Sequence, residues 1–416
     1  MFDELMGRIA GRFARVEPRR RTRSFVLGLL ADLPRKNCWT IAEHAGDATP
    51  DGMQYLLERA SWDADVVRDD VRGYVVEQLA DRQAVLVVDE TGDVKKGTAT
   101  AGVQRQYTGT AGRVENAQVA VYLTYAGRGG HALIDRELYL PRSWISDPGR
   151  CRAAGIPRQV AFATKPALAR RMIARALDGG VPAAWVTGDE VYGADPGLRT
   201  DLEKRRANYV LAVAKDHHAA TGAGALRADA LAARLPPRAW QRMSAGPGAK
   251  GHRWYDWAWV AIEPGRPGLH WLLIRRNRRT CELAYYRCYS PCHVSLAAFV
   301  RVAGRRWTTE ENFQASKGLT GLDEHQVRTW TAWHRWVTLA MLALAFLTVA
   351  SVTERDHRPP PAGMIPLTRN EIAHLTAAMI THPAHARHRL RWSAWRRRHQ
   401  YRARACHYRR QAAQGP

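Results

Sequence analysis

Apolar residues near the start of the chain recur at intervals of three or four, which is the spacing of an amphipathic helix. The repeat runs from Arg19 to about Asp81 and includes Phe25, Leu29 and Leu56. It predicts an all-helical N-terminal domain over residues 1–80.

A turn-rich break at Gly46–Gly52 separates two of these predicted helices. Gln54 and Tyr55 come early in the helix that follows, as base-contacting residues do in a helix-turn-helix unit. The arginines within Arg19–Arg23 favour DNA binding by this domain. The alternative is a small helical packing module that contacts no bases.

The pattern changes at Ala84–Val88, a continuous apolar run that is typical of a strand buried on both faces and that ends in Asp89. Two further apolar runs flank a glycine-rich turn and predict an antiparallel hairpin. Helical spacing then alternates with short apolar runs, the first of which ends in Asp189. In order, these segments are strands at 118–125 and 132–140, a helix at 159–177, a strand at 184–187, a helix at 198–206 and a strand at 209–213.

The rest of the chain divides by composition and spacing. Residues 219–293 combine glycine and proline with aromatic runs, which predicts a β-rich insertion. Residues 81–218 and 294–355 then form one α/β domain, and 356–416 a basic C-terminal tail. The uncharged run Trp336–Val352 reaches the minimum length of a membrane span, but its charged flank favours a buried core helix and no membrane contact.

Charge indicates the kind of partner. The 416 residues include 63 Lys and Arg against 39 acidic residues, so the formal net charge is +24. This excess favours nucleic acid over a merely basic surface. Residues Ala384–Pro416 contain ten Arg, four His and no carboxylate, so we expect a mobile cationic tail. Six scattered cysteines and no recognisable secretory signal predict a reducing cytoplasm.

Three acids far apart in the sequence form the candidate catalytic set. Asp89 and Asp189 each follow a predicted strand, and Glu310 lies in a later helix between Arg306 and Lys317. Carboxylates gathered in one cleft need a compensating cation, and oxygen-only ligands favour magnesium. Taken singly, the aspartates are more often helix caps or turn residues, and a helical glutamate is usually solvated.

Longer blocks of sequence surround these acids. They are Val87–Gly97, Val186–Gly193, the Arg306–Lys317 segment and Gly321–Arg328. Together they resemble the DDE transposases of bacterial insertion sequences, which are DDE superfamily endonucleases. The spacing of Arg306, Glu310 and Lys317 is similar to that family's Tyr-Arg-Glu-Lys signature. The most similar group is insertion-sequence family 701, within the insertion-sequence 4 superfamily, over roughly residues 19–352.

This resemblance implies an RNase-H-like catalytic domain with a mixed sheet in the order β-β-β-α-β-α-β-α, a β insertion and an N-terminal helical domain. It implies that Asp89, Asp189 and Glu310 bind two Mg²⁺ ions, for which Mn²⁺ can substitute. It further implies that Arg306 and Lys317 hold phosphates near the cleaved DNA end.

Other positions fit the family pattern less closely. Lys95 and Lys96 follow the first aspartate closely enough to contact a phosphate, with solvated lysines as an equal alternative. Glu311 breaks the signature's spacing, so we expect it to have a structural or supporting part. Ala303 stands where the signature has tyrosine, so that role is missing or filled elsewhere. The aromatic run 254–259 suits either a stacking platform for an unpaired base or core packing, which is the stronger alternative.

The leading hypothesis is a metal-dependent DNA endonuclease and strand transferase that binds the terminal inverted repeats of its element, cleaves the ends and joins them to target DNA. Its partners would be double-stranded DNA and a second copy of the chain in the synaptic complex. It would act in the bacterial cytoplasm, associated with the nucleoid when bound to DNA. The alternatives are a catalytically inactive or immobile transposase-derived DNA-binding protein, and a nuclease of the same fold that hydrolyses without strand transfer.

Overall fold

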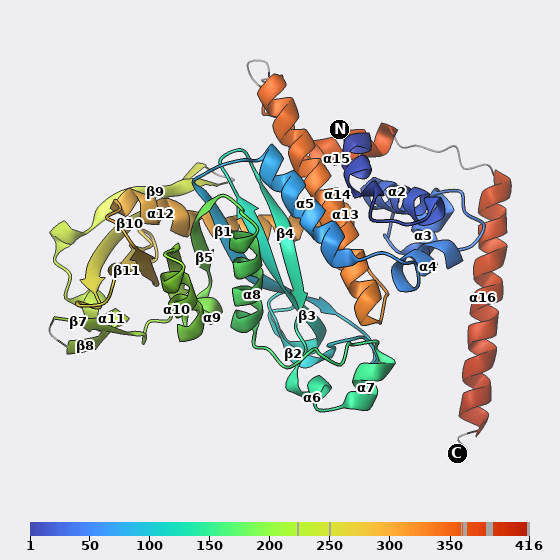
Figure 1. Cartoon of the computed structure of the whole chain (residues 1–416), viewed down its shortest axis with the longest axis horizontal. Coiled ribbons are helices and arrows are strands. Elements are labelled where there is room, and N and C mark those ends of the chain that lie inside the picture. The colour runs from blue at the N-terminus through green and yellow to red at the C-terminus, as the bar shows by residue number, and fades with distance from the viewer. Residues whose placement is uncertain (223, 249–250, 359, 361–363, 380–385, 414–416) are drawn as a thin grey trace. The chain divides into compact units, whose positions relative to one another are not determined.

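The structure is a computed structural model, and it describes residues 1–416 except 223, 249–250, 359, 361–363, 380–385 and 414–416. The chain divides into two compact units. One consists of Arg68–Ala315, and the other combines Met1–Val67 with Ser316–Pro416. We call them the sheet unit and the helical unit and describe each by itself (Figure 1).

The helical unit contains α-helices from both ends of the chain. They are α1 (Phe2–Ala10), α2 (Val16–Leu30), α3 (Cys38–His44), α4 (Asp51–Glu58), the start of α5 (Ala64–Gln78), the end of α13 (Trp307–Thr320), α14 (Trp330–His357), α15 (Arg369–Met379) and α16 (Ala386–Ala413). The predicted helices of the first eighty residues are thus present, with α3 and α4 flanking the predicted turn.

Helix α14 is the apolar helix of the sequence pattern. It is long and apolar enough to cross a membrane, but 89% of its most apolar stretch is buried in the structure, as expected of a core helix. It packs against α2, α4 and α15, and Arg335 donates to the backbone oxygens of Leu57 and Trp62. The predicted α/β domain includes α14 within 294–355, whereas the structure groups this helix with the N-terminal helices.

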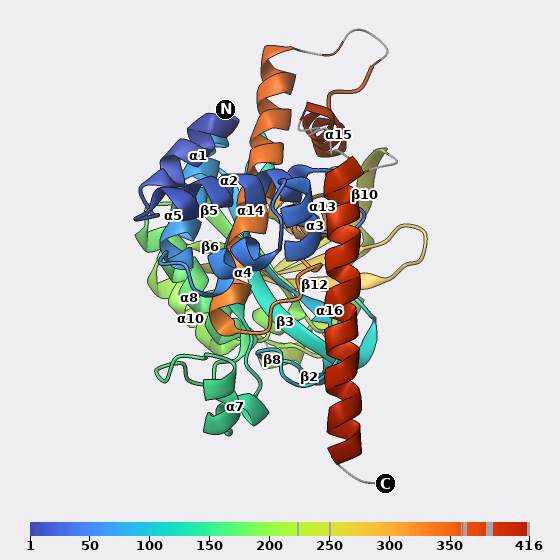
Figure 2. The same ribbon diagram turned by 90° about the vertical axis from the view of Figure 1, so that its right-hand side faces the viewer.

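The expectation of a mobile C-terminal tail is wrong for α16. The charge run suggested a solvated segment, but Trp392 is fully buried and its indole nitrogen donates to the backbone oxygen of Asp47 at 2.8 Å. Burial of a tryptophan with its N–H paired offsets the entropy lost when the segment becomes ordered. Figure 2 shows α16 as one continuous helix.

Ten strands of the described sheet unit form one mixed sheet. They are β1 (Ala84–Val94), β2 (Gln104–Thr108), β3 (Arg113–Ala126), β4 (His131–Leu138), β5 (Ala183–Gly188), β6 (Asn208–Val213), β9 (Gln241–Gly248), β10 (Gly251–Ile262), β11 (Leu269–Arg276) and β12 (Leu283–Ser290). The strands β7 (His218–Thr221) and β8 (Gly224–Arg227) form a separate hairpin.

The strand order confirms the predicted fold class. Strand β3 is antiparallel to both β1 and β4, whereas β5 is parallel to β1 and to β6. The resulting order β4-β3-β1-β5-β6 is that of an RNase-H-like sheet. Two features were not predicted: the additional strand β2, and the extension of β1 beyond Asp89 to Val94.

The predicted β-rich insertion continues this sheet. Strand β12 is antiparallel to β6, and β11, β10 and β9 follow outward in turn. Sheet pairing therefore joins the insertion rigidly to the strands that carry the two aspartates.

The sheet unit also contains the helices α6 (Arg142–Ile145), α7 (Pro148–Ala153), α8 (Lys165–Asp178), α9 (Glu190–Gly193), α10 (Pro196–Lys204), α11 (Ala228–Ala233) and α12 (Leu296–Arg305). Of these, α8, α9, α10 and α12 pack against the sheet. Because side chains alternate along a strand, Val85 and Val87 share one face of β1. They belong to a core cluster with Trp185, whose ring contacts Phe299 of α12 at 5.7 Å. Helix α12 therefore covers this face.

Candidate active site

The register of β1 and β5 brings the two aspartates together. These parallel strands are paired up to Val88 and Gly188, and Asp89 and Asp189 each come next in their chains. Neighbouring strands lie about 4.8 Å apart, so the two aspartates start from adjacent positions at the same end of the strand pair. This adjacency agrees with the sequence expectation for the first two acids.

Strand alternation directs Asp89 toward α12. Asp89 has the same parity as Val85 and Val87, so its side chain lies on the face that α12 covers. Arg306 directly follows α12, and its guanidinium lies 3.8 Å from the carboxylate of Asp89 and 2.9 Å from that of Glu310. One cation thus contacts both the first and the third predicted acid.

Buried polar contacts fix the start of α13, which carries Glu310. Thr309 and Asn312 are fully buried and hydrogen-bond to the hydroxyl of Thr124 on β3, at 3.2 and 3.3 Å. The ring of Phe313 meets Tyr122 edge-on at 5.5 Å. Since Tyr122 is the cross-strand partner of Asp89, α13 lies over the part of the sheet that carries the acid.

Burial makes this site electrostatically unfavourable for bare carboxylates. Desolvation, and then repulsion by Asp189 and Glu90, raise the pKa of Asp89 from 3.8 to about 7. Desolvation and repulsion by Glu90 also raise the pKa of Asp189, although the backbone N–H groups of Val191 and Tyr192, and then Arg306, oppose this. Burial lowers the pKa of Arg306, but the carboxylates of Glu310 and Asp89 outweigh it and raise that pKa.

The donor set fits a hard divalent cation. The carboxylates of Asp89 and Asp189 are crowded and partly desolvated, so a cation would relieve their repulsion, and their oxygens suit magnesium. Glu310 is held against Arg306, and no group of three or more acidic, His or Cys side chains in the described chain is already arranged as a metal cage. Arg306 offsets part of the negative charge by its contacts with Asp89 and Glu310.

The two aspartates also make the local backbone contacts that are common for an acid after a strand. A carboxylate oxygen of Asp189 accepts from the backbone N–H of Val191 at 2.9 Å and caps α9. A carboxylate oxygen of Asp89 accepts from the N–H of Glu90 at 2.8 Å. Each aspartate therefore has a second oxygen besides the one that holds it in place.

Lys95 and Lys96 are not brought to this site. They follow the end of β1, which runs on as a strand past Asp89, so they lie about 20 Å along the strand from it. They therefore lie apart from the first aspartate, and their contact with a DNA phosphate stays a prediction. Lys317 follows Glu310 by seven residues on α13 and belongs to the helical unit.

Two glutamates next to the predicted acids have other contacts. Glu311 lies 3.1 Å from His131 of β4. Glu90, one residue after Asp89, faces the opposite side of the sheet, where it pairs with Lys165 at 2.7 Å and accepts from the hydroxyl of buried Tyr192. Sequence analysis missed Glu90, although the alternation that begins at Ala84 would have assigned it to the other face.

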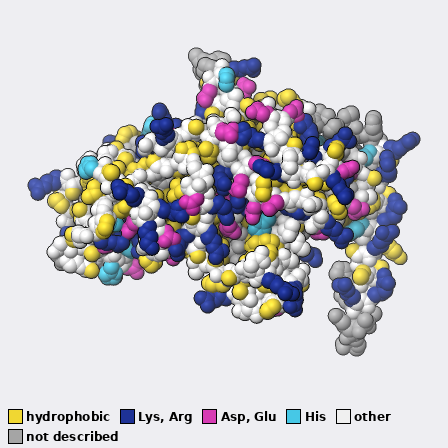
Figure 3. Space-filling view, in the orientation of Figure 1, with side chains coloured by type: hydrophobic (Ala, Val, Ile, Leu, Met, Phe, Trp, Pro, Cys, Tyr) yellow, Lys and Arg dark blue, Asp and Glu magenta, His cyan; other side chains and the backbone are white. Residues whose placement is uncertain are grey.

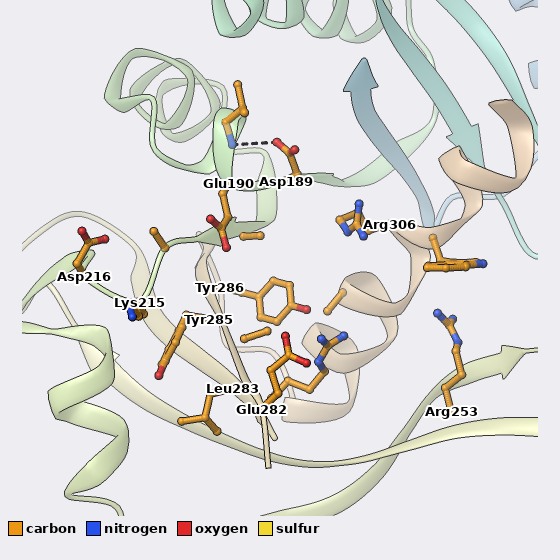
Figure 4. Close-up of a pocket in the computed structure, with 17 residues that line it drawn as sticks. Asp189, Glu190, Lys215, Asp216, Arg253, Glu282, Leu283, Tyr285, Tyr286 and Arg306 are labelled. Atoms are coloured by element: carbon orange, nitrogen blue, oxygen red, sulfur yellow. Dashed lines mark hydrogen bonds between the residues drawn. The ribbon is translucent and has the colours of Figure 1, made fainter. Parts of the chain in front are cut away.

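A cavity of about 880 Å³ opens beside Asp189 and Arg306 (Figure 4). Basic, acidic and aromatic side chains line it, among them Arg253, Arg275, Glu282, Tyr286 and Trp307. Ala303, at the signature's tyrosine position, also lines the cavity. Tyr286 of β12 supplies a phenol there instead, and burial raises its pKa.

Most of the aromatic run 254–259 packs in the core. Trp257 is 1% exposed, and Tyr255 and Trp259 pack against the core cluster that contains Phe299. Trp254 is 47% exposed and lies beneath the guanidinium of Arg242. Core packing therefore accounts for most of the run.

An RNase-H-like sheet with two aspartates at the junction of β1 and β5, and a glutamate on a helix above it, is the architecture of a nucleic-acid phosphoryl-transfer enzyme. The chain belongs to the DDE superfamily endonucleases, whose family model matches residues 8–258. This match confirms the resemblance found in the sequence blocks and includes Asp89 and Asp189.

Similarity to individual proteins is narrower. The chain is 30% identical over 195 residues to a "Probable transposase for insertion sequence element IS701" from Microchaete diplosiphon, and the match covers 46% of this chain. The chain spans about half of that relative, since the match covers 48% of it. A solved piggyBac transposase synaptic complex with hairpin DNA aligns at a TM-score of 0.41 and 10% identity, over 91% of this chain and 78% of that one.

Proposed function

We propose that this protein is a transposase that binds the terminal inverted repeats of its insertion sequence, cleaves DNA at the ends and joins the 3′ hydroxyls to target DNA. The observation that carries the proposal is that Arg306 contacts the carboxylates of Asp89 and Glu310 beside the strand pair that leads to Asp189. Membership of the DDE superfamily endonucleases supports DNA as the substrate.

The proposed chemistry assigns roles to the chain's own residues. Asp89, Asp189 and Glu310 would hold two Mg²⁺ ions, with Mn²⁺ able to substitute. Such ions activate a water or a 3′ hydroxyl and stabilise the leaving oxygen in in-line phosphoryl transfer. Arg306 would donate to a phosphate oxygen of the DNA beside the acids. Lys317 would bind a phosphate farther along the same DNA strand.

The adjoining cavity supports a single-stranded end near the acids. Arg253 and Arg275 can neutralise phosphates, and the half-exposed Trp307 offers aromatic surface to a base. We propose that the cavity receives nucleotides next to the cleaved bond.

The matched variants Glu310→Gln and Glu311→Gln test the catalytic assignment. The substrate is DNA that carries the inverted repeats flanking the gene, incubated with magnesium. We expect Glu310→Gln to lower cleavage by orders of magnitude and to leave DNA binding unchanged. Glu311→Gln removes a neighbouring carboxylate of the same helix that is 47% exposed, so cleavage should stay near the wild-type rate. Equal rates for the two variants would remove Glu310 from the mechanism.

The same assay separates the alternatives. Tight binding by the wild type without cleavage would indicate an inactive DNA-binding descendant. Cleavage without joined products would indicate a nuclease. For the transposase we propose a homodimer, since two ends must be held together, and light scattering of the protein with and without end DNA measures that state.

A further inference from the structure

Five arginines form a stripe along α16. They are Arg387, Arg391, Arg398, Arg402 and Arg409, and all five are exposed. Their spacings of four and seven residues alternate, which places them within about 60° of one another around the helix. The stripe extends over about 33 Å, because a helix rises about 1.5 Å per residue. Arginine side chains, in dark blue, are visible along this helix in Figure 3.

The side of α16 next to the stripe attaches to the N-terminal helices. Trp392 is fully buried and donates to the backbone oxygen of Asp47, in the turn between α3 and α4. The rings of Trp395 and Trp39 meet edge-on at 4.7 Å. These contacts fix the helix against α3, so the stripe is part of an ordered surface (Figure 2).

The charge of α16 is not balanced within the helix. The segment Ala386–Ala413 contains no Asp or Glu. Arg396, which lies on the docking side, pairs with Glu43 of α3 at 2.5 Å. The five stripe residues are exposed and carry their charge to the surface.

We propose that this arginine stripe binds the phosphate backbone of double-stranded DNA. The inference rests on the proposed function, in which DNA is the substrate, and adds the surface that holds it outside the catalytic site. Guanidinium groups bind phosphates bidentately, and a row of about 33 Å matches one turn of B-form DNA, about 34 Å. Because phosphates carry no base identity, the contacts are independent of sequence.

Two double variants on the same helix test the stripe. Arg398→Gln with Arg402→Gln removes two stripe residues, and Arg397→Gln with Arg404→Gln removes the same charge from another side of α16. Binding is measured by fluorescence anisotropy with a mixed-sequence duplex of about 30 base pairs, in EDTA, from about 50 to 200 mM KCl. We expect the stripe variant to bind more weakly and its log–log salt slope to fall by about two, while the control slope changes by less than about one.

Several results would overturn the proposal. Equal slopes for the two double variants would do so, as would wild-type binding to phosphatidylserine vesicles or single-stranded RNA in preference to the duplex. Intrinsic tryptophan fluorescence reports the docking of α16. If Arg398→Gln with Arg402→Gln changes this fluorescence, the double variant Arg387→Gln with Arg391→Gln replaces it in the assay. That second variant must then show the same decrease in salt slope.

The assay requires no cleavage, so it separates the two proposals. A wild type that cleaves end DNA, together with a stripe variant of unchanged slope, overturns the stripe alone. A wild type that binds through the stripe but never cleaves end DNA overturns the transposase proposal alone.

Discussion

The crowding of carboxylates predicts that the catalytic site costs the protein stability when no metal is bound. The substitution Asp89→Asn removes one buried negative charge and keeps nearly the same shape. It leaves Arg306 paired with Glu310, so no new uncompensated charge is created. We therefore expect this variant to be inactive and, at neutral pH in EDTA, more stable than the wild type.

The magnitude follows from the pKa of Asp89, about 7 in the folded protein against an ordinary value of 3.8. Below about pH 4 the carboxyl of Asp89 is protonated in both the folded and the unfolded protein, so it does not lower the free energy of unfolding. As the pH rises toward 7 folding takes up a proton, so the free energy of unfolding falls by about 1.36 kcal/mol per pH unit. Above pH 7 the penalty reaches about 4 kcal/mol. The side chain is only 14% exposed, so solvent screening reduces this little.

Urea unfolding at a series of pH values measures the effect. The stabilisation by Asp89→Asn should be about 2.7 kcal/mol larger at pH 8 than at pH 5, since pH 5 lies about two units below the folded pKa. Adding Mg²⁺ should stabilise the wild type more than the variant, because the ion binds only the folded site. The control Asp178→Asn removes an exposed carboxylate whose pKa is lowered by Arg205, so it should give no such gain. A gain for Asp89→Asn that is the same at pH 5 and pH 8 would refute the argument.

Two further substitutions test how the site is held. A β-carbon at Gly304 would lie 2.0 Å from the backbone oxygen of Ala245, so Gly304→Ala should displace the end of α12 and lower cleavage about 100-fold. A β-carbon at Gly73 would have no neighbour within 4 Å, so the control Gly73→Ala should cleave at the wild-type rate. A similar loss of cleavage in the two variants would exclude the clash with Ala245 as its cause. Thr309→Val removes the buried hydrogen bond to Thr124 and should lower the free energy of unfolding by about 1 kcal/mol in urea titrations, and an unchanged value would show that this bond does not anchor α13.

The central strands and the first two acids were predictable because both depend on local pattern. A continuous apolar run such as Ala84–Val88 indicates a strand buried on both faces, and an acid directly after it lies at the edge of the apolar core. The extension of β1 to Val94 was not predictable in this way. Residues 90–93 interrupt the apolar run, and only the pairing with β3 keeps them in the strand.

The C-terminal helix illustrates a different limit. Its charge density predicted a solvated tail, and the charge is indeed exposed along the stripe. The order of α16 depends on Trp392 and Trp395, whose partners Asp47 and Trp39 lie some 350 residues earlier. Composition describes the exposed side of such a helix, whereas its docking depends on contacts that local sequence cannot indicate.

The same limit explains the missing tyrosine of the signature. The pattern of residues around Arg306 shows only that Ala303 is small and leaves space beside the cation. Tyr286 reaches that cavity because β12 pairs with β6, in a register that places Tyr286 opposite Ala212. A shift of one residue would turn the phenol to the other face of the sheet. The positions of the two aspartates thus follow from the sequence, while the aromatic and basic lining depends on how the insertion joins the sheet.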